Sequence, residues 1–350
     1  MLSAIPDQAE DITADWLSES LGEEVLDCQL VASHSGTTGR ARITLETSAD
    51  SALPPTLFVK LPPGGPVQRE FVCSSGMGRR EARFYRELGG EVPVRVPRCY
   101  FADWDDSGRH YIILLEDLDD TGCTFRNATR DYSLDYVRAM LQSFAHLHAR
   151  YWKSERFGLD LNWVQPPLQH EIAPRLVALA RDQHAASMPP VFSELCELYL
   201  NHTDAVHQLW LIGSETLIHG DVHDGNLFRD GVAPGFLDWA LLARGPAMRD
   251  VSYFLAGTLP EEHRPMQRDL INEYREQLEG QGVEAPSLDE LWLQHRCQVF
   301  YPWVGAVTTL AMGDQWQPLS YVQATLTRLH AVVAALDTAG VVREWIAATR

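Results

Sequence analysis

The sequence predicts an α+β fold in two parts: an N-terminal antiparallel sheet lobe with one main helix, and a larger helical C-terminal lobe. Three observations predict this division. Strand-like segments fill the first third of the chain, strongly periodic helices follow from Leu134, and the acidic run Glu116-Asp117-Leu118-Asp119-Asp120 separates them. A chain of 350 residues suits two such parts, since a domain takes about 150 residues. We expect an N-terminal lobe over residues 1–115, a hinge over 116–120 and a helical lobe over 121–350.

The elements of the N-terminal lobe follow from short apolar runs separated by turn residues. A short helix begins at Asp11, with Thr13 as its cap, and ends near Gly22. Strands are then expected over 25–33, 40–47, 56–61, 96–101 and 110–115. The one main helix is expected over 68–88, because Met77, Glu81, Phe84, Tyr85 and Leu88 fall on one helical face.

The C-terminal lobe is helical with one exception. Helical periodicity predicts helices over 134–152, 172–181, 190–211, 247–258, 262–279, 288–312 and 319–339. The exception is the segment 216–238, which reads as a short strand, a polar loop and a second short strand.

Composition excludes several classes of function. The 29 basic and 48 acidic residues leave a net charge of −19, which gives no electrostatic footprint for nucleic acid or an anionic membrane surface. The six cysteines form no CxxC pair, and no apolar run approaches the ~18 residues of a membrane span. No secretory signal is visible at the start of the chain. We expect a cytoplasmic protein with a small-molecule partner; the sequence indicates no oligomeric state.

The segment 217–228, LIHGDVHDGNLF, holds the densest group of reactive side chains. An apolar strand ends at His219-Gly220-Asp221, Asn226 follows five residues after the aspartate, and a second buried strand ends at Asp238. Carboxylate and amide oxygens suit Mg²⁺, which keeps phosphate oxygens and water as its other ligands. Protein kinases use the same layout, with a catalytic-loop aspartate, a metal-binding asparagine and a further metal-binding aspartate.

Two other interpretations of this segment are open. His219, Asp221, His223 and Asp224 could ligate a hydrolytic Zn²⁺, although no second histidine-rich cluster follows downstream. The segment could also be a capped turn with solvated acids. We expect His219 to brace the loop by hydrogen bonds and His223 to be structural.

The catalytic segment resembles that of the aminoglycoside phosphotransferase and choline kinase-like superfamily. With FLDWALLARGPAMRDVSYFL and LQSFAHLHARYW, it is most similar to the branch of ecdysteroid kinase-like and uncharacterised bacterial phosphotransferases. The resemblance spans roughly residues 16–313. It implies a bilobal protein-kinase-like fold that binds ATP and Mg²⁺, with Asp221 as the catalytic carboxylate and Asn226 and Asp238 as metal ligands.

The resemblance directs attention to a lysine on the third strand and a glutamate on the next helix. Lys60 lies in the otherwise apolar run Leu57-Phe58-Val59-Lys60. Glu81 lies on the apolar face of the following helix, where an unpaired carboxylate would be costly to bury. We expect the two to pair and Lys60 to contact the α- and β-phosphates.

A phosphate-covering turn is expected between the first two strands. Ser35-Gly36-Thr37-Thr38-Gly39-Arg40 lies there, and its two glycines allow backbone N–H groups to turn toward phosphate oxygens. Arg40 adds a positive charge. A plain hairpin turn is the alternative interpretation.

The resemblance also assigns residues at the hinge and beyond the catalytic loop. It implies that the Glu116 carbonyl and the Leu118 N–H bind adenine, and that Asp250 braces the catalytic loop. It places the acceptor pocket in the helical lobe, where Trp303, Tyr301 and Trp316 are candidates. Aromatic residues at helical spacing are also typical of a core.

We therefore predict an ATP- and Mg²⁺-dependent kinase of small-molecule hydroxyl groups. A protein acceptor is disfavoured, because Ala243-Arg244-Gly245-Pro246 runs almost directly into a helix. The rival from another class is a silent nucleotide-binding pseudokinase. The net charge of −19 suits a cationic aminoglycoside acceptor, but charges act weakly beyond a Debye length of ~8 Å, so the aromatic residues favour an apolar or steroid-like alcohol.

Overall fold

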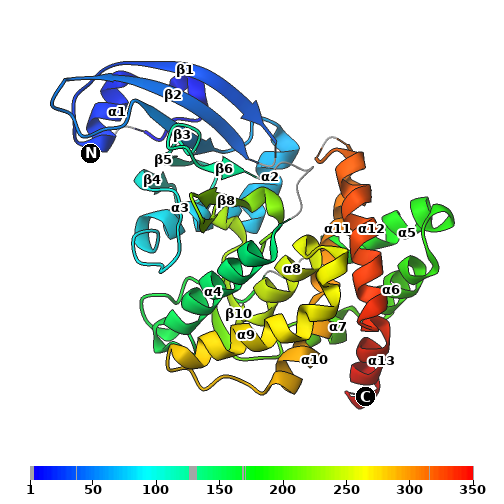
Figure 1. Cartoon of the computed structure of the whole chain (residues 1–350). Helices are drawn as coiled ribbons and strands as arrows, with labels where there is room; N and C mark the ends of the chain where they lie inside the picture. The colour runs from blue at the N-terminus through cyan, green and yellow to red at the C-terminus, as the bar shows by residue number, and fades with distance from the viewer. Residues whose placement is uncertain are drawn as a thin grey trace. The chain divides into compact units, whose positions relative to one another are not determined.

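The computed structural model describes residues 4–36, 38–125, 132–167, 169, 171–314 and 316–349. It divides into two compact units: Met1–Phe125 with Asn226–Leu242, and Arg126–Gly225 with Ala243–Arg350. An antiparallel sheet organises the first unit and helices organise the second, as the sequence predicts (Figure 1). Residues 226–242, which carry two of the expected site residues, pack with the N-terminal unit.

The first unit is built on a five-stranded antiparallel sheet with the strand order β1-β2-β3-β5-β4. The strands are β1 (Val25–Ser35), β2 (Gly39–Thr47), β3 (Thr56–Leu61), β4 (Cys99–Trp104) and β5 (Tyr111–Glu116). Side chains alternate between the two faces of each strand. Leu57, Val59 and Leu61 therefore enter a core on one face, and Lys60 points to the other.

The first helix, α1 (Ala14–Leu21), contributes to the core of that first face. It begins at Ala14 rather than at Asp11, but its two capping residues are as predicted: the Thr13 hydroxyl accepts the Trp16 N–H, and Gly22 ends the helix in the left-handed conformation with φ 71°. Trp16 and Leu17 are buried with the apolar residues of the strands.

Two helices occupy the region of the single predicted helix 68–88. They are α2 (Pro66–Ser75) and α3 (Met77–Glu87). Gly76 between them has φ 67°, a conformation that ends a right-handed helix. Contacts of α3 with β4 and β5 place it against the sheet, and Glu81, Phe84 and Tyr85 lie on its buried side.

A small hairpin completes the first unit. It consists of β8 (Leu227–Asp230) and β9 (Ala233–Phe236), and β8 also pairs with β6 (Thr124–Phe125). The register places Leu227 opposite Phe236. The residues just outside this pair, Asn226 and Leu237, are joined by a hydrogen bond from the Leu237 N–H to the Asn226 carbonyl, 3.0 Å long.

The second unit is mainly helical, with one two-stranded ladder. Its α-helices are α4 (Leu134–Arg150), α5 (Ile172–His184), α6 (Pro190–Asn201), α7 (Thr203–Leu209), α8 (Met248–Thr258), α9 (Gln267–Gly280), α10 (Leu288–Gln298), α11 (Phe300–Met312), α12 (Leu319–Ala335) and α13 (Thr338–Ala348). The ladder pairs β7 (Glu215–Ile218) with β10 (Ala243–Pro246), antiparallel. In the two units together, short 3₁₀ turns cover Ala9–Asp11, Glu155–Gly158, Ala185–Ser187, Asp224–Asn226, Trp239–Leu241 and Glu261–Met266.

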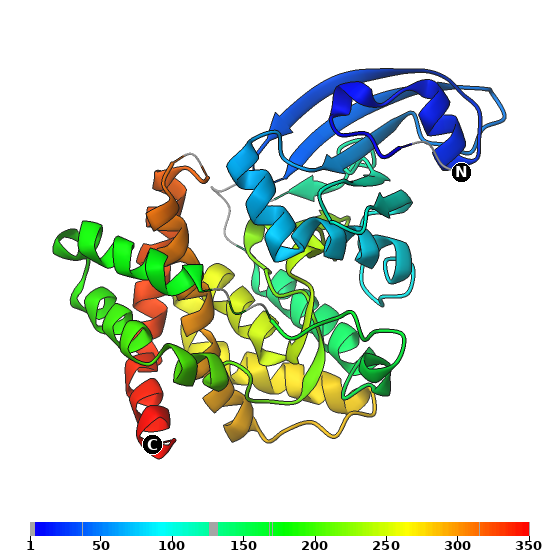
Figure 2. The same ribbon diagram turned by 180° about the vertical axis from the view of Figure 1, so that it is seen from behind.

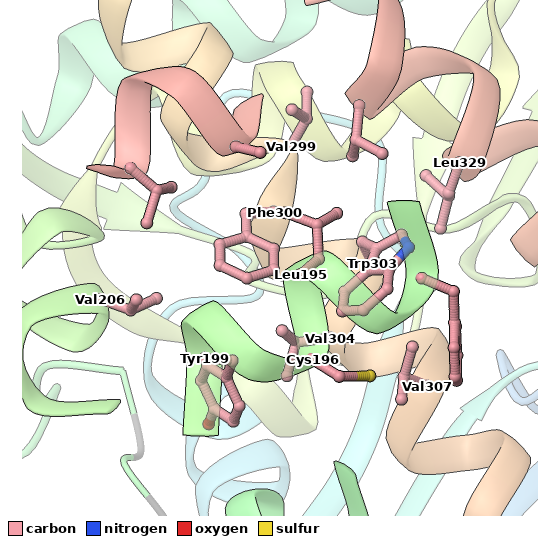
Figure 3. Packing of buried hydrophobic residues seen from close by; sticks show 14 of the residues in the cluster. Leu195, Cys196, Tyr199, Val206, Val299, Phe300, Trp303, Val304, Val307 and Leu329 are labelled. Atoms are coloured by element: carbon pink, nitrogen blue, oxygen red, sulfur yellow. The ribbon is translucent and has the colours of Figure 1, made fainter. Parts of the chain in front are cut away.

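A large apolar core holds the second unit together. Helices α5, α6, α11, α12 and α13 surround it, and α11 packs against both α5 and α12 (Figure 2). Figure 3 shows Trp303 inside this core beside Val307 and Leu329. The predicted helices 190–211 and 288–312 are each split, at His202 (φ −140°) and at Val299. Among the described residues, no helix is long and apolar enough to cross a membrane.

Candidate functional site

The first unit brings together a buried lysine and two carboxylates. Lys60 Nζ lies 2.6 Å from Glu81 Oε1 and 3.2 Å from Asp238 Oδ1. Lys60 is 4% exposed and Glu81 is fully buried. The residues expected to pair are thus in contact, and the metal-ligand candidate Asp238 shares the same ammonium group.

The charges of this group are unbalanced, because two carboxylates face one ammonium. Burial raises the pKa of Glu81 to about 7, against the opposing effect of Lys60. Burial also opposes the charge of Lys60, but Asp238 and Glu81 outweigh it, so its pKa lies above the usual value. A cation bound at Asp238 would relieve the surplus of negative charge.

Helix α3 contacts the segment that follows Asp238. The rings of Phe84 and Trp239 stack with centroids 4.1 Å apart, and Arg80 Nη1 donates to the Ala240 carbonyl at 2.8 Å. The sequence analysis did not assign Arg80 or Trp239 to the site. The stack and this hydrogen bond fix the metal-ligand candidate relative to the helix that carries Glu81.

The hairpin positions the two candidate metal ligands. Asn226 precedes β8 and Asp238 follows β9 by two residues, and the hydrogen bond between Leu237 and Asn226 joins the two ends. Asn226 is 5% exposed. An amide oxygen and a carboxylate from neighbouring strand ends form a hard oxygen donor set, which fits Mg²⁺.

Asp238 has an uncommon backbone conformation. Its φ and ψ are 62° and 68°, in the left-handed region that few residues other than glycine adopt. Only two other described residues that are not glycine have a positive φ. Such strain is typical of functional positions.

The turn between β1 and β2 requires glycine at one position. A Cβ atom on Gly39 would lie 2.6 Å from the Pro62 carbonyl oxygen, so no other residue fits without a backbone shift. The pairing of β2 with β3 sets Arg40 opposite Lys60, which places two cations beside each other. The Gly36 N–H donates to the Thr38 carbonyl at 3.1 Å.

The structure also describes Ser35 and Thr38 of the expected phosphate turn. Thr38 is buried, and its hydroxyl accepts a hydrogen bond of 3.4 Å from Arg40 Nε. Ser35 ends β1. Thr37 lies outside the described residues. The arrangement is compatible with both a phosphate-binding turn and a plain hairpin.

The expected hinge begins at the last residue of β5. The Glu116 carboxylate accepts two hydrogen bonds from Arg95, at 2.9 and 2.6 Å, and one from the Arg98 N–H at 2.9 Å. Burial opposes ionisation, but these bonds outweigh it and the pKa of Glu116 is lowered. Leu118 lies in a small apolar cluster with Cys123 and Phe228. These hydrogen bonds all involve the side chain of Glu116. Binding of adenine by the Glu116 backbone carbonyl stays a prediction.

The second unit holds the catalytic-loop candidates. His219 and Asp250 are fully buried, and the Asp250 carboxylate accepts the His219 N–H at 2.7 Å and the Gly220 N–H at 2.9 Å. The Asp221 N–H donates to His219 Nδ1 at 3.3 Å. The two residues expected to support the loop therefore hold its main chain on both sides of Gly220, which has φ 83°.

The alternative of a zinc site needs several ligands in one place. Among the residues that the structure describes, no group of three or more His, Cys, Asp and Glu side chains is arranged to hold a metal ion. His223 Nδ1 accepts the Gly225 N–H at 3.0 Å, so this ring takes part in the turn itself.

The three aromatic acceptor candidates lie in different environments. Trp303 is fully buried in the core of the second unit (Figure 3). Tyr301 lies under the guanidinium of Arg249, with 4.1 Å from its ring centroid to Arg249 Cζ. Trp316 follows the end of α11, and its backbone N–H donates to the Gly313 carbonyl at 3.1 Å. Contact between Trp303 and an acceptor would require the core to open.

Comparisons with known proteins bear on the family and the fold of the chain. The model of the phosphotransferase enzyme family matches residues 41–287. No curated protein matches the sequence significantly. A protein of Ralstonia eutropha JMP134 assigned to the aminoglycoside phosphotransferases has a similar structure, with a TM-score of 0.51, 14% identity and coverage of 95% of this chain and 96% of that one.

Two further solved structures are complexes of one kind of enzyme. The GDP complex of aminoglycoside 2'-phosphotransferase-IIIa has a TM-score of 0.53 and 12% identity, with 89% of this chain and 94% of that chain covered. The GDP and kanamycin complex of APH(2")-IIIa also has a TM-score of 0.53 and 12% identity, with 90% and 97% covered. At such identities the likeness shows the kinase-like fold alone. Because the family model covers more than half of the sequence, the chain belongs to the phosphotransferase enzyme family.

Proposed function

We propose that this protein transfers the γ-phosphate of ATP to a hydroxyl group of a small molecule, with Mg²⁺ as cofactor. The observation that carries the proposal is Lys60, buried between Glu81 and Asp238. A buried ammonium held by one glutamate and one metal-ligand carboxylate is suited to a polyphosphate tail. Family membership supports phosphoryl transfer, and the GDP named in two neighbouring structures supports a purine nucleotide as the donor.

Each residue of the set has a role in this reaction. Lys60 neutralises phosphate charge, and Glu81 holds its ammonium group in place. Asp221 orients the acceptor hydroxyl and accepts its proton as the O–P bond forms and the bond to ADP breaks. Asn226 and Asp238 would hold Mg²⁺, which supplies positive charge to the phosphates. Phosphoryl transfer depends mainly on such positioning and charge stabilisation.

The course of the chain after Asp238 favours a small acceptor over a protein. A 3₁₀ turn, the four-residue strand β10 and helix α8 follow one another closely, so only Ala247 separates β10 from α8. This leaves little chain for a peptide-binding platform. The neighbour that contains kanamycin supports an aminoglycoside acceptor. The burial of Trp303 removes one reason to prefer an apolar alcohol, so both classes belong in the test.

The test measures ADP release by the full chain with Mg·ATP and a panel of alcohols that includes hydroxysteroids and kanamycin. Asp221→Asn serves as the control. We expect acceptor-dependent ADP release by the wild type and a loss of at least about 100-fold in the variant. Salt separates the acceptor classes, because binding of a polycationic sugar weakens as screening increases.

A silent nucleotide-binding module would behave differently. It would be stabilised thermally by Mg·ADP but release no more ADP than Asp221→Asn with any acceptor. The presence of Lys60, Asp221, Asn226 and Asp238 together argues against that alternative. Parallel runs with GTP establish the preferred nucleotide.

A further inference from the structure

We propose that Tyr253 is a positioning residue that orients the carboxylate of Asp221 for phosphoryl transfer. This inference rests on the proposed function, and it gives a role to a residue that the sequence analysis did not assign to the site. Tyr253 lies on α8, in the second unit, and its hydroxyl donates a hydrogen bond of 3.2 Å to Asp221 Oδ1.

The hydroxyl of Tyr253 is well suited to a constant role as donor. Burial and the nearby charge of Asp221 raise the pKa of the phenol well above its usual value. The group therefore stays protonated wherever an enzyme of this kind works. A neutral donor to one oxygen of an ionised carboxylate makes a charge-assisted hydrogen bond.

Helix α8 holds the catalytic loop at two levels. Asp250, in its first turn, fixes the backbone N–H groups of His219 and Gly220. Tyr253 follows three residues later, so it lies on the same helical face. One rigid element thus holds the loop's main chain through Asp250 and its reactive side chain through Tyr253.

The residues behind Asp250 and Tyr253 keep both in place. His148 Nε2 lies 3.5 Å from Asp250 Oδ2, and His148 Nδ1 lies 2.8 Å from the hydroxyl of Tyr274. The ring of Tyr253 meets that of Tyr301 edge to face, with centroids 6.1 Å apart. The donor position is therefore set by packing on the ring as well as by the helix.

Orientation matters because an aspartate side chain can rotate about the bond to its carboxyl group. Proton transfer requires the accepting oxygen within about 2.6–3.2 Å of the hydroxyl and correctly aligned. A hydrogen bond to Oδ1 fixes the plane of the carboxylate before the acceptor arrives. Small errors of placement at a reacting centre cost large factors in rate.

The test compares Tyr253→Phe with the wild type, using water as the acceptor and Mg·ATP as the donor, with ADP release as the readout. Phenylalanine keeps the ring and removes the hydroxyl. We expect kcat to fall roughly 10- to 100-fold, because the hydrogen bond to a charged group is lost, while KM for ATP changes less than about twofold. Tyr253→Leu removes the same hydroxyl from a smaller side chain and should lose kcat at least as strongly.

Tyr199→Phe is the matched control. Tyr199 is fully buried in the same unit, and its hydroxyl lies 3.0 Å from His207 Nε2. The control should lose a similar amount of thermal stability with kcat unchanged. A second readout is Tyr253→Phe in the Asp221→Asn background, where no further loss of rate is expected because the two residues act as one unit.

Three outcomes would overturn the assignment. Tyr253→Phe with wild-type kcat would remove the positioning role and leave the proposed function intact. An equal fall of kcat in Tyr199→Phe would make the effect one of general stability. A wild type that binds Mg·ADP but releases no ADP with water or with any alcohol of the panel would instead defeat the proposed function, and the role of Tyr253 with it.

Discussion

Phe84 and Trp239 stack nearly parallel, with ring centroids 4.1 Å and ring planes 12° apart. Phe84 lies one turn after Glu81 on α3, and Trp239 directly follows Asp238. The lysine-holding residue and the metal-ligand candidate are thereby coupled by aromatic contact within one unit. Loss of the stack should loosen both.

The first prediction concerns this stack. Phe84→Leu should weaken Mg·ADP binding about 3- to 10-fold, because stacked rings contribute about 0.5–1.5 kcal/mol beyond the area they bury. Isothermal titration measures the affinity. Phe192→Leu, a change of the same kind in the core of the second unit, should leave it unchanged. Equal weakening by both variants would contradict a specific role.

The second prediction separates the roles proposed for Asp221 and Asp238. Asp238→Ala should abolish the dependence of nucleotide binding on Mg²⁺, because it removes the carboxylate of the proposed metal site. Asp221→Asn should keep Mg·ADP affinity within about twofold and stop transfer. Thermal shift with and without Mg²⁺ and ADP release check both. Near-normal turnover of Asp221→Asn would make another group the base.

The third prediction concerns Trp303. Trp303→Ala should destabilise the second unit by about 3–5 kcal/mol, because it opens a cavity in a packed core. Urea unfolding measures the loss, and Leu293→Ala at an exposed position of α10 should change stability by less than about 0.5 kcal/mol. A stable Trp303→Ala with a raised acceptor KM would place this side chain in the acceptor pocket instead.

The fourth prediction concerns acid stability. His295 is fully buried between Ser252 Oγ and Gln267 Oε1, each 3.0 Å away, and burial lowers its pKa to about 3. Between pH 6.5 and 3 the unfolded chain therefore binds a proton that the folded chain does not. The free energy of unfolding should rise with pH in this window by up to about 1.4 kcal/mol per unit and level off above pH 6.5.

Melting curves between pH 4 and 8 test the role of His295. The melting temperature of His295→Gln should fall less steeply toward pH 4 than that of the wild type. His34→Gln, at an exposed position, should follow the wild-type curve. Parallel curves for all three proteins would show that another group governs the acid limb.

The strands and caps of the first unit were largely predictable from sequence. Strand β3 has the bounds that its apolar run predicts, and Thr13 and Gly22 cap α1 as their residue types indicate. The family resemblance implied a pair of lysine and glutamate, and the cost of burying an unpaired carboxylate indicated Glu81 as the partner of Lys60. Local patterns suffice for such features, because each depends on few neighbours.

Interruptions within long periodic segments were missed for a physical reason. At Val299 the backbone keeps helical angles, φ −62° and ψ −16°, so the apolar period continues across the junction of α10 and α11. At His202 the backbone leaves the helical conformation, with φ −140°, and histidine is not a residue type that indicates the end of a helix. At Gly76 a signal was present, since glycine is common where a helix ends.

Side-chain contacts from separate segments were harder to foresee. Tyr253 could have been suspected from its spacing of three after Asp250, but only the fold brings its hydroxyl to Asp221. The aromatic residues of α11 show that composition alone does not predict an acceptor pocket. Periodicity cannot distinguish a residue that lines a ligand pocket from one that fills a core, and Trp303 is in the core.

The left-handed backbone of Asp238 has a consequence for how the sequence can evolve. Here the strained φ of 62° opposes folding, and the carboxylate of Asp238 repels that of Glu81 although both attract Lys60. Asparagine tolerates this conformation and carries no charge, so Asp238→Asn should melt at a temperature equal to or above that of the wild type while losing Mg²⁺-dependent binding. A lower melting temperature would contradict this trade-off. At Asp238 the chain would thus give up stability for the ability to bind a metal ion.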